Sequence, residues 1–212
     1  MSEPLGSDQI EIQARAYGLN FKDVFVTLGQ MAPGSAMTGK AAGVVTAVGE
    51  NFQANSGVVA IPDSVSFIDA ASIPIIHYTA LFSMTHVARL EKNRSVLFHA
   101  ASGGVGQAAM QITQMIGTKI FATIFSSHAP FFAKHVMEAT QGVGVGVVLN
   151  SLPGQLLMES WDCVAQLATF LEIRKANIYA GSRLNTNNLE KQATFAALDT
   201  SQKYQLRPEY MA

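Results

Sequence analysis

The sequence predicts an α/β protein built on a parallel, doubly wound sheet, and two observations lead to that prediction. From residue 66 onward, short apolar runs alternate with amphipathic patterns of helical period, as a parallel sheet covered by helices requires. One apolar run, beginning at Ser95, ends in a glycine-rich turn that opens directly onto a helical pattern at 105–116. A second apolar run at 119–124 completes a βαβ unit.

The glycine-rich turn is the strongest functional signal in the chain. Gly103 and Gly104 let the backbone turn tightly and approach a pyrophosphate, while Gly106 lacks the Cβ that would hold helix and strand apart. The helix that follows offers free N–H groups and the positive end of its dipole to an anion. A structural turn between strand and helix is the alternative. The pattern predicts a dinucleotide-binding loop formed by Ala101, Ser102, Gly103, Gly104, Val105 and Gly106.

Composition limits the classes of function. Lys and Arg total 14 and Asp and Glu total 15 in 212 residues, so the charge gives no reason to expect binding to nucleic acid or an anionic membrane. The polar N-terminal segment lacks the pattern of a signal peptide, and no apolar run has transmembrane length. Cys163 is the only cysteine, which fits a reducing, cytoplasmic location. The five histidines lack metal-ligand spacing, so no zinc site is expected.

We expect an N-terminal portion at 1–65, a sheet portion at 66–200 and a polar tail at 201–212. Residues 9–17 alternate apolar and polar side chains, as a half-exposed strand does. Helices are expected at 20–28, 66–72, 78–89, 105–116, 133–140 and 156–167. Besides the strand at 9–17 and the run that begins at Ser95, strands are expected at 42–48, 119–124, 145–149 and 169–173. One more element is expected within 191–199.

Five sequence words occur in a fixed order along the chain, at 18–24, 42–49, 69–74, 99–109 and 147–152. In this order they resemble the medium-chain dehydrogenase/reductase superfamily, and most of all the enoyl reductase domain of fungal highly reducing polyketide synthases. The words Leu-Asn-Phe-Lys-Asp and Ala-Ala-Ser-Gly-Gly-Val-Gly-Gln are specific, and the resemblance covers nearly all of residues 9–199.

This resemblance implies a fold, an activity and partners. The fold is a Rossmann-type parallel sheet beside a GroES-like β-barrel, which is truncated in this chain. The activity is NADPH-dependent reduction of an α,β-unsaturated acyl thioester in polyketide synthesis. The implied partners are a substrate held on a carrier protein and other polyketide synthase domains.

The resemblance also assigns roles to individual residues. Lys175 and Asp199 lie where related enoyl reductases carry their catalytic lysine and aspartate, although by themselves they are an ordinary lysine after a strand and a solvated carboxylate. Asn20 and Thr79 match positions near the nicotinamide. Asn150 and Ser151 match a polar pair at a strand end on its other side. Capping of a helix or turn is the alternative for these four residues.

The residues after Thr123 indicate which nicotinamide cofactor is preferred. No acidic side chain follows the strand expected to end there, so the ribose clamp typical of NAD is missing. Ser126 and Ser127 would tolerate a 2′-phosphate instead. The sequence therefore favours NADP over NAD.

The chain also departs from the family pattern. Barrel strands are missing after Gly57, and a crossover is missing after Ile124, where the family carries a basic 2′-phosphate segment. Point departures are Lys40 for glutamate, Gly146 for aspartate, Ala168-Thr169 for Gly-Arg, and Arg174 for the glycine before Lys175. Two other hypotheses therefore stay open: a noncatalytic structural remnant of a polyketide synthase, and a quinone oxidoreductase-like enzyme.

Overall fold

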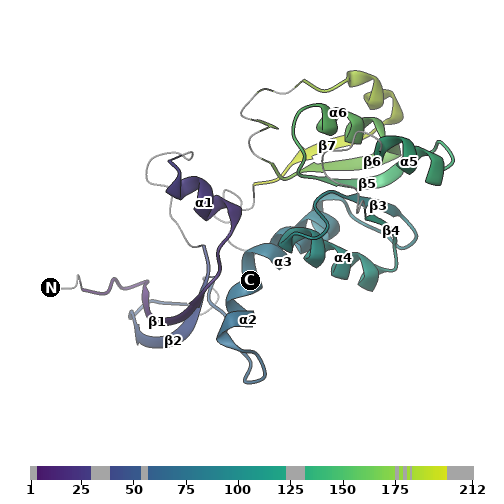
Figure 1. Ribbon diagram of the computed structural model, residues 1–212. Helices are drawn as coiled ribbons and strands as arrows, with labels where there is room; N and C mark the ends of the chain where they lie inside the picture. Colours follow the sequence, from purple (N-terminus) through teal and green to yellow (C-terminus); the bar gives the residue numbers. More distant parts are fainter. Residues whose placement is uncertain are drawn as a thin grey trace. The chain divides into compact units, whose positions relative to one another are not determined.

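A computed structural model of the chain describes residues 4–29, 39–53, 57–122, 132–174, 177–178, 181 and 183–199. These residues form two compact units that divide between Tyr78 and Thr79. Figure 1 labels the helices and strands of both units.

The first unit is built on an antiparallel ribbon. Strand β1 (Ile10–Tyr17) pairs with β2 (Ala41–Val48), and the register shifts twice along the pair. Helix α1 (Phe21–Thr27) follows Asn20, whose N–H donates to the Asp23 carboxylate at 2.7 Å. Helix α2 (Phe67–Ser72) has Ser66 as its N-cap, as predicted. Within the described residues this ribbon does not close into a barrel, so the expected barrel portion is a two-stranded remnant.

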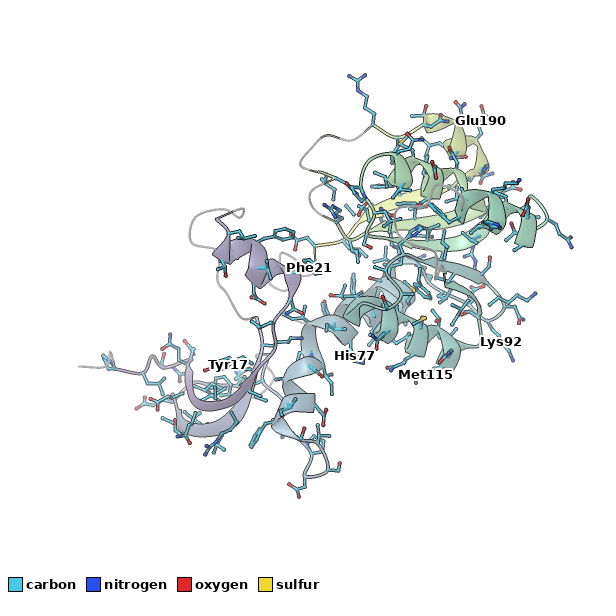
Figure 2. All side chains as sticks on the ribbon, in the orientation of Figure 1. Tyr17, Phe21, His77, Lys92, Met115 and Glu190 are labelled. Carbon is cyan, nitrogen blue, oxygen red and sulfur yellow. The ribbon has the colours of Figure 1, made fainter. Side chains whose placement is uncertain are left out.

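Little apolar surface is buried in the first unit. Among its described residues, Ala42 and Ala71 are the only buried hydrophobic side chains. Tyr17 and Phe21 are 64% and 80% exposed, and both project from the ribbon and α1 in Figure 2. A Cβ on Gly18 would lie 2.4 Å from the Ala71 carbonyl oxygen, so this glycine permits the close contact between the ribbon and α2.

The second unit contains a five-stranded parallel sheet in the order β4-β3-β5-β6-β7. Its strands are β3 (Ser95–Phe98), β4 (Lys119–Ala122), β5 (Val145–Asn150), β6 (Val164–Glu172) and β7 (Thr194–Ala197). Its helices after β3 are α4 (Gly104–Ile116), α5 (Phe132–Ala139), α6 (Gln155–Asp162) and the 3-10 helix η2 (Thr186–Lys191). Figure 1 shows α4 on one side of this sheet and α6 on the other. The predicted α/β class with a Rossmann-type sheet is confirmed.

The sheet has the doubly wound order with one strand fewer. A six-stranded sheet of this kind has the order 3-2-1-4-5-6, and the described strands reproduce it without the third strand. Strand β4 therefore lies at an edge of the described sheet. The crossover that the sequence pattern predicts to be missing after Ile124 would lead to that third strand, next to β4.

Apolar side chains from α5 and α6 cover one face of the sheet. All six residues of β5 are buried. Trp161 packs edge-to-face on Phe170 with ring centroids 5.5 Å apart, and its Nε1 donates to the Asn185 carbonyl at 2.7 Å. This core holds the strands in register and fixes the ends from which the site loops leave.

Two expected elements differ from the structure. Helix α3 (Pro74–Leu81) begins at its proline, earlier than the predicted 78–89, and continues as a π-helix, η1 (Phe82–Val87). The predicted helix at 156–167 ends at Asp162, and β6 begins at Val164. Leu167 has a φ of 58°, which a helix does not allow, and it lies where the register between β5 and β6 shifts.

Candidate functional site

The carboxyl ends of β3 and β5 mark the point where the strand order of the second unit reverses. Strand β3 continues through α4 to β4 on one side, and β5 continues through α6 to β6 on the other. Ligands of open parallel sheets bind outside the strand ends at such a point. The His99 N–H donates to the Leu149 carbonyl at 3.2 Å, so the loop after β3 begins beside the end of β5.

The glycine loop ends in an uncapped helix N-terminus. Gly103 is the N-cap of α4 and supplies no side chain to cap it. The first hydrogen bond within the helix runs from Gln107 N to Gly103 O, so the amides of 104–106 precede it. The Gln107 side chain donates to the Ser102 carbonyl at 2.6 Å and ties the loop to the helix. These three amides and the helix dipole suit an anion.

Close packing at Gly106 agrees with its predicted role. An added Cβ would lie 2.5 Å from the Ala100 carbonyl oxygen and 2.7 Å from the Ala101 Cα, both backbone atoms of the loop. The tight turn itself differs from the expectation. Ala100 adopts the left-handed conformation, with a φ of 51°, whereas Gly103 is extended with a φ of −75°. The strained residue in this loop is therefore an alanine.

Asn150 and Ser151 lie at the carboxyl end of β5. This strand pairs with β3, and the glycine loop follows β3. The Asn150 side chain is fully buried, and its Nδ2 donates to the Glu172 carboxylate at 2.8 Å and to the Leu152 carbonyl at 3.0 Å. Its Oδ1 accepts from Leu152 N at 3.2 Å, which is the geometry of a capped turn. Ser151 is half-buried and more accessible. A cofactor contact by this pair stays a prediction.

The other predicted site residues are distributed over both units. Asn20 precedes α1 in the first unit, and Thr79 is a buried residue of α3 whose carbonyl accepts from the Ser83 hydroxyl. Asp199 is half-buried and follows β7. Lys175, Ser126 and Ser127 lie outside the described residues.

The segments that carry Lys175 and Asp199 leave the sheet from neighbouring strand ends. Glu172 on β6 pairs with Ala197 on β7, and the Leu198 N–H donates to the Glu172 carbonyl at 2.9 Å. Arg174, which replaces a family glycine, is not among the residues with a positive φ. The backbone at position 174 therefore does not need glycine in this chain, so the replacement of the family glycine by arginine does not by itself strain the backbone before Lys175.

A buried polar group at the end of β6 was not predicted. The Glu172 carboxyl is fully buried and accepts hydrogen bonds from Asn150 and Asn177, and burial raises its pKa. A pocket of about 180 Å³ adjoins it, lined by Leu157, Glu172, Asn177, Ile178, Gly181, Leu184 and Phe195. The sequence signal was an acidic residue closing an apolar strand run, but its partners depend on the tertiary register.

His99 is a hydrogen-bonded core histidine. Its Nε2 lies 2.8 Å from the Ser160 Oγ, and that hydroxyl donates to the Leu156 carbonyl at 2.6 Å. The hydroxyl proton is therefore directed away from the imidazole, and the pair is not an activated nucleophile. Across the described ranges, no group of three or more His, Cys, Asp or Glu residues could hold a metal ion. The described helices include none long and apolar enough to cross a membrane.

Similar proteins include a highly reducing polyketide synthase of Penicillium oxalicum, which is 37% identical over 243 aligned positions. The alignment covers 94% of this chain and 10% of that synthase, so the chain spans about a tenth of the length of the curated relatives it matches. Because the chain has only 212 residues, at least 31 of the 243 aligned positions have no counterpart in it. No family model matches the chain.

Solved structures give the same result. The CurK enoyl reductase superposes with a TM-score of 0.86 at 29% identity, covering 100% of this chain and 79% of that one. The nucleotide-binding subdomain of the enoylreductase domain of PpsC from Mycobacterium tuberculosis is 34% identical, with a TM-score of 0.62 and coverage of 65% and 87%. With its parallel sheet, its glycine loop and these relatives, the chain belongs to the enoyl reductase domains of polyketide synthases, in an abridged form.

Proposed function

We propose that this chain is an NADPH-dependent enoyl reductase domain that reduces the double bond of an α,β-unsaturated acyl thioester carried on a polyketide synthase. Membership of the family supports an enoyl reductase-type oxidoreductase. One observation carries the proposal furthest. The uncapped N-terminus of α4 lies at the strand-order reversal, and Gly106 lets α4 pack directly on the loop backbone.

The loop residues 101–106 would hold the cofactor pyrophosphate. The amides of 104–106 precede the first bond of α4, and α4 is 13 residues long, so its dipole adds to them. Ser151 is the accessible polar residue at the neighbouring strand end. We assign Asn20 and Thr79 to the nicotinamide half and Ser126 and Ser127 to the 2′-phosphate, following the resemblance.

The reaction adds two hydrogens across a carbon–carbon double bond. The reduced nicotinamide, when bound, supplies a hydride to the β-carbon. The protein must then stabilise the enolate that forms on the thioester and deliver a proton to the α-carbon. We assign the proton delivery and the charge stabilisation to Lys175 and Asp199, whose segments leave neighbouring strands at the same edge of the sheet.

A noncatalytic remnant is the second candidate, and two observations favour it. At least 31 positions of the Penicillium relative are missing, and the first unit buries only two hydrophobic residues among those described. A hydride-transfer site needs its groups placed to within about 1 Å, and misplacement by that amount can cost on the order of a hundredfold in rate. A chain whose first unit has so small a hydrophobic core can keep the cofactor loop of the second unit and still lose turnover.

NADPH titration and crotonyl-thioester reduction, both on the purified chain, distinguish the candidates. Saturable NADPH binding with slow oxidation that Lys175→Ala and Asp199→Ala each reduce would support the reductase. Binding without oxidation would support the remnant. Absence of NADPH binding, or turnover that neither substitution changes, would contradict the proposed function.

A further inference from the structure

The carboxyl end of β6 holds a buried acid that no step of the proposed reaction uses. Glu172 is the last residue of β6 and is 0% exposed, like Leu171 before it. It pairs with Asn150 on β5 and with Ala197 on β7, so its strand is paired on both sides. Glu172 therefore lies at the carboxyl end of an interior strand, where the site segments leave the sheet.

Three N–H groups surround the Glu172 carboxylate. The backbone N–H of Arg174 donates to Oε1 at 2.7 Å. The side-chain Nδ2 groups of Asn150 and Asn177 donate to Oε2 at 2.8 Å and 3.0 Å. Both oxygens are therefore engaged, and every neighbour in this set is a donor.

The two asparagines share a second acceptor, which closes the network. Asn150 Nδ2 and Asn177 Nδ2 also donate to the Leu152 carbonyl, at 3.0 Å and 2.9 Å. Each amide group thus bridges the same two acceptors, Glu172 Oε2 and Leu152 O. The network joins the turn after β5, the end of β6 and the segment that follows β6.

This set of neighbours suits a carboxylate, because both of its oxygens accept hydrogen bonds. A glutamine at 172 would direct its own NH₂ group toward at least one of the three donors. Among the described residues the side chain makes no direct ion pair, since the ion pair found there joins Lys134 and Glu138, but the positive charge of Arg174 favours its ionised form. Burying a carboxylate is costly, so the three hydrogen bonds and this charge together retain it.

Two of the three donors flank residues 175–176 in the chain. Arg174 directly precedes Lys175 in the chain, and Asn177 follows Ala176. We propose that Glu172 is a positioning residue, whose carboxylate fastens both ends of the segment that carries Lys175 to the carboxyl ends of β5 and β6. This inference rests on the proposed function for the role of Lys175. The anchor uses the backbone N–H of residue 174, so it accepts arginine there as well as glycine.

Native-state proteolysis tests the anchor without requiring turnover. Trypsin cleaves after arginine and lysine, so Arg174 and Lys175 are its targets here, and the proposed anchor on residues 174 and 177 predicts that cleavage needs these contacts to open. Glu172→Gln should speed cleavage at these two bonds at least tenfold, measured by mass spectrometry of timed digests. Asn188→Ala is the matched control, because Asn188 is also buried and donates to Trp161 O and Asp162 Oδ1, away from the segment. The control should change these two cleavages only as far as its global stability changes.

Kinetics separate positioning from general destabilisation. At temperatures where both variants are folded, Glu172→Gln should lower kcat at least tenfold with the KM for NADPH unchanged, while Asn188→Ala should leave both within twofold. If the wild-type chain shows no turnover, the proposed function fails and proteolysis alone decides the anchor. Equal cleavage of wild type and Glu172→Gln would overturn the inference. If Glu172→Gln does not fold, Asn177→Ala, which removes one of the three donors, takes its place with the same criteria.

Discussion

Buried ionisable side chains in this chain are stabilised in three different ways. His99 is held neutral by burial, and its Nε2 is hydrogen-bonded to the Ser160 hydroxyl. Glu172 is surrounded by donors, although burial raises its pKa. Burial lowers the pKa of Lys40, and the negative charge of Asp23 offsets part of that effect. The lowered pKa values of His99 and Lys40 make the fold more stable as the pH rises through their titration ranges, and the raised pKa of Glu172 acts in the opposite direction.

His99 should make the second unit less stable in acid. Burial lowers its pKa from 6.5 to about 4, so between these values the unfolded chain binds a proton that the folded chain does not. The free energy of unfolding should therefore fall by up to about 3 kcal/mol as the pH drops from 7 to 4. The raised pKa of Glu172 acts the opposite way and stabilises the fold at the acid end.

Urea unfolding of His99→Gln between pH 4 and 7 measures this contribution. The variant should have a flatter dependence of stability on pH than the wild type. His86→Gln is the control, because it makes the same substitution at an exposed position. Parallel curves for wild type and His99→Gln would show that another group sets the acid sensitivity.

At the scale of elements, the glycine loop joins β3 to α4 through backbone hydrogen bonds and one side-chain bond, from Gln107 to the Ser102 carbonyl. The Ala100 carbonyl accepts from Gly103 N at 2.9 Å, and the three amides of 104–106 stay available at the helix end. A negative charge on the first residue of a helix stabilises that helix through the dipole. The same charge repels a bound anion, so folding and binding can be separated at this element.

Gly104→Asp should abolish or strongly weaken NADPH binding while leaving the fold intact. The new carboxylate would stand at the first residue of α4, against the pyrophosphate, and a loss of affinity on the order of tenfold to a hundredfold follows from repulsion of one charge at partly screened distance. Fluorescence titration with NADPH measures it. Gln155→Asp places the same charge at the first residue of α6 and should bind normally. Unchanged affinity in Gly104→Asp would refute the assignment of the loop.

Elements with an uninterrupted local pattern were predictable, whereas others depended on tertiary pairing. Helix α4 combines an apolar stripe with Gly117 as a left-handed C-cap, so its bounds follow from the sequence. The apolar residues of 156–167 fit a helix as well as a strand. The structure divides them after Asp162, where Val145 N bonds to the Cys163 carbonyl and β6 begins. The local sequence pattern of 156–167 cannot predict this hydrogen bond, because its donor lies in β5.

The same distinction applies to the candidate site. The loop at 101–106 is contiguous in sequence and was predicted from spacing. The Glu172 network joins Asn150, Leu152 and Asn177, which are separated by up to 27 residues and meet only after β5 and β6 pair in register. The roles of Lys175 and Asp199 come from the family resemblance and stay predictions.

At the scale of the whole molecule, the two units differ in how much apolar surface they bury. The second unit buries Trp161, Phe98, Phe170 and Met84 completely, and large side chains of this kind each contribute roughly 1.5–3 kcal/mol. The first unit, among its described residues, buries two alanines and leaves Leu19 and Phe21 mostly exposed. Stability should therefore be concentrated in the second unit.

Hydrogen exchange should show that the first unit opens separately and more easily. Amides of β1 and β2 need only the opening of a two-stranded ribbon, while those of β5 need the loss of a buried sheet, so their protection should differ by at least about a hundredfold. Strand β4 is the internal control, because it is paired on one side only in the described sheet, as β2 is. If edge position alone governed exchange, β4 and β2 would exchange equally fast. Slower exchange in β4 would assign the difference to the core beneath it, and equal protection of β2 and β5 would show that the two units unfold as one.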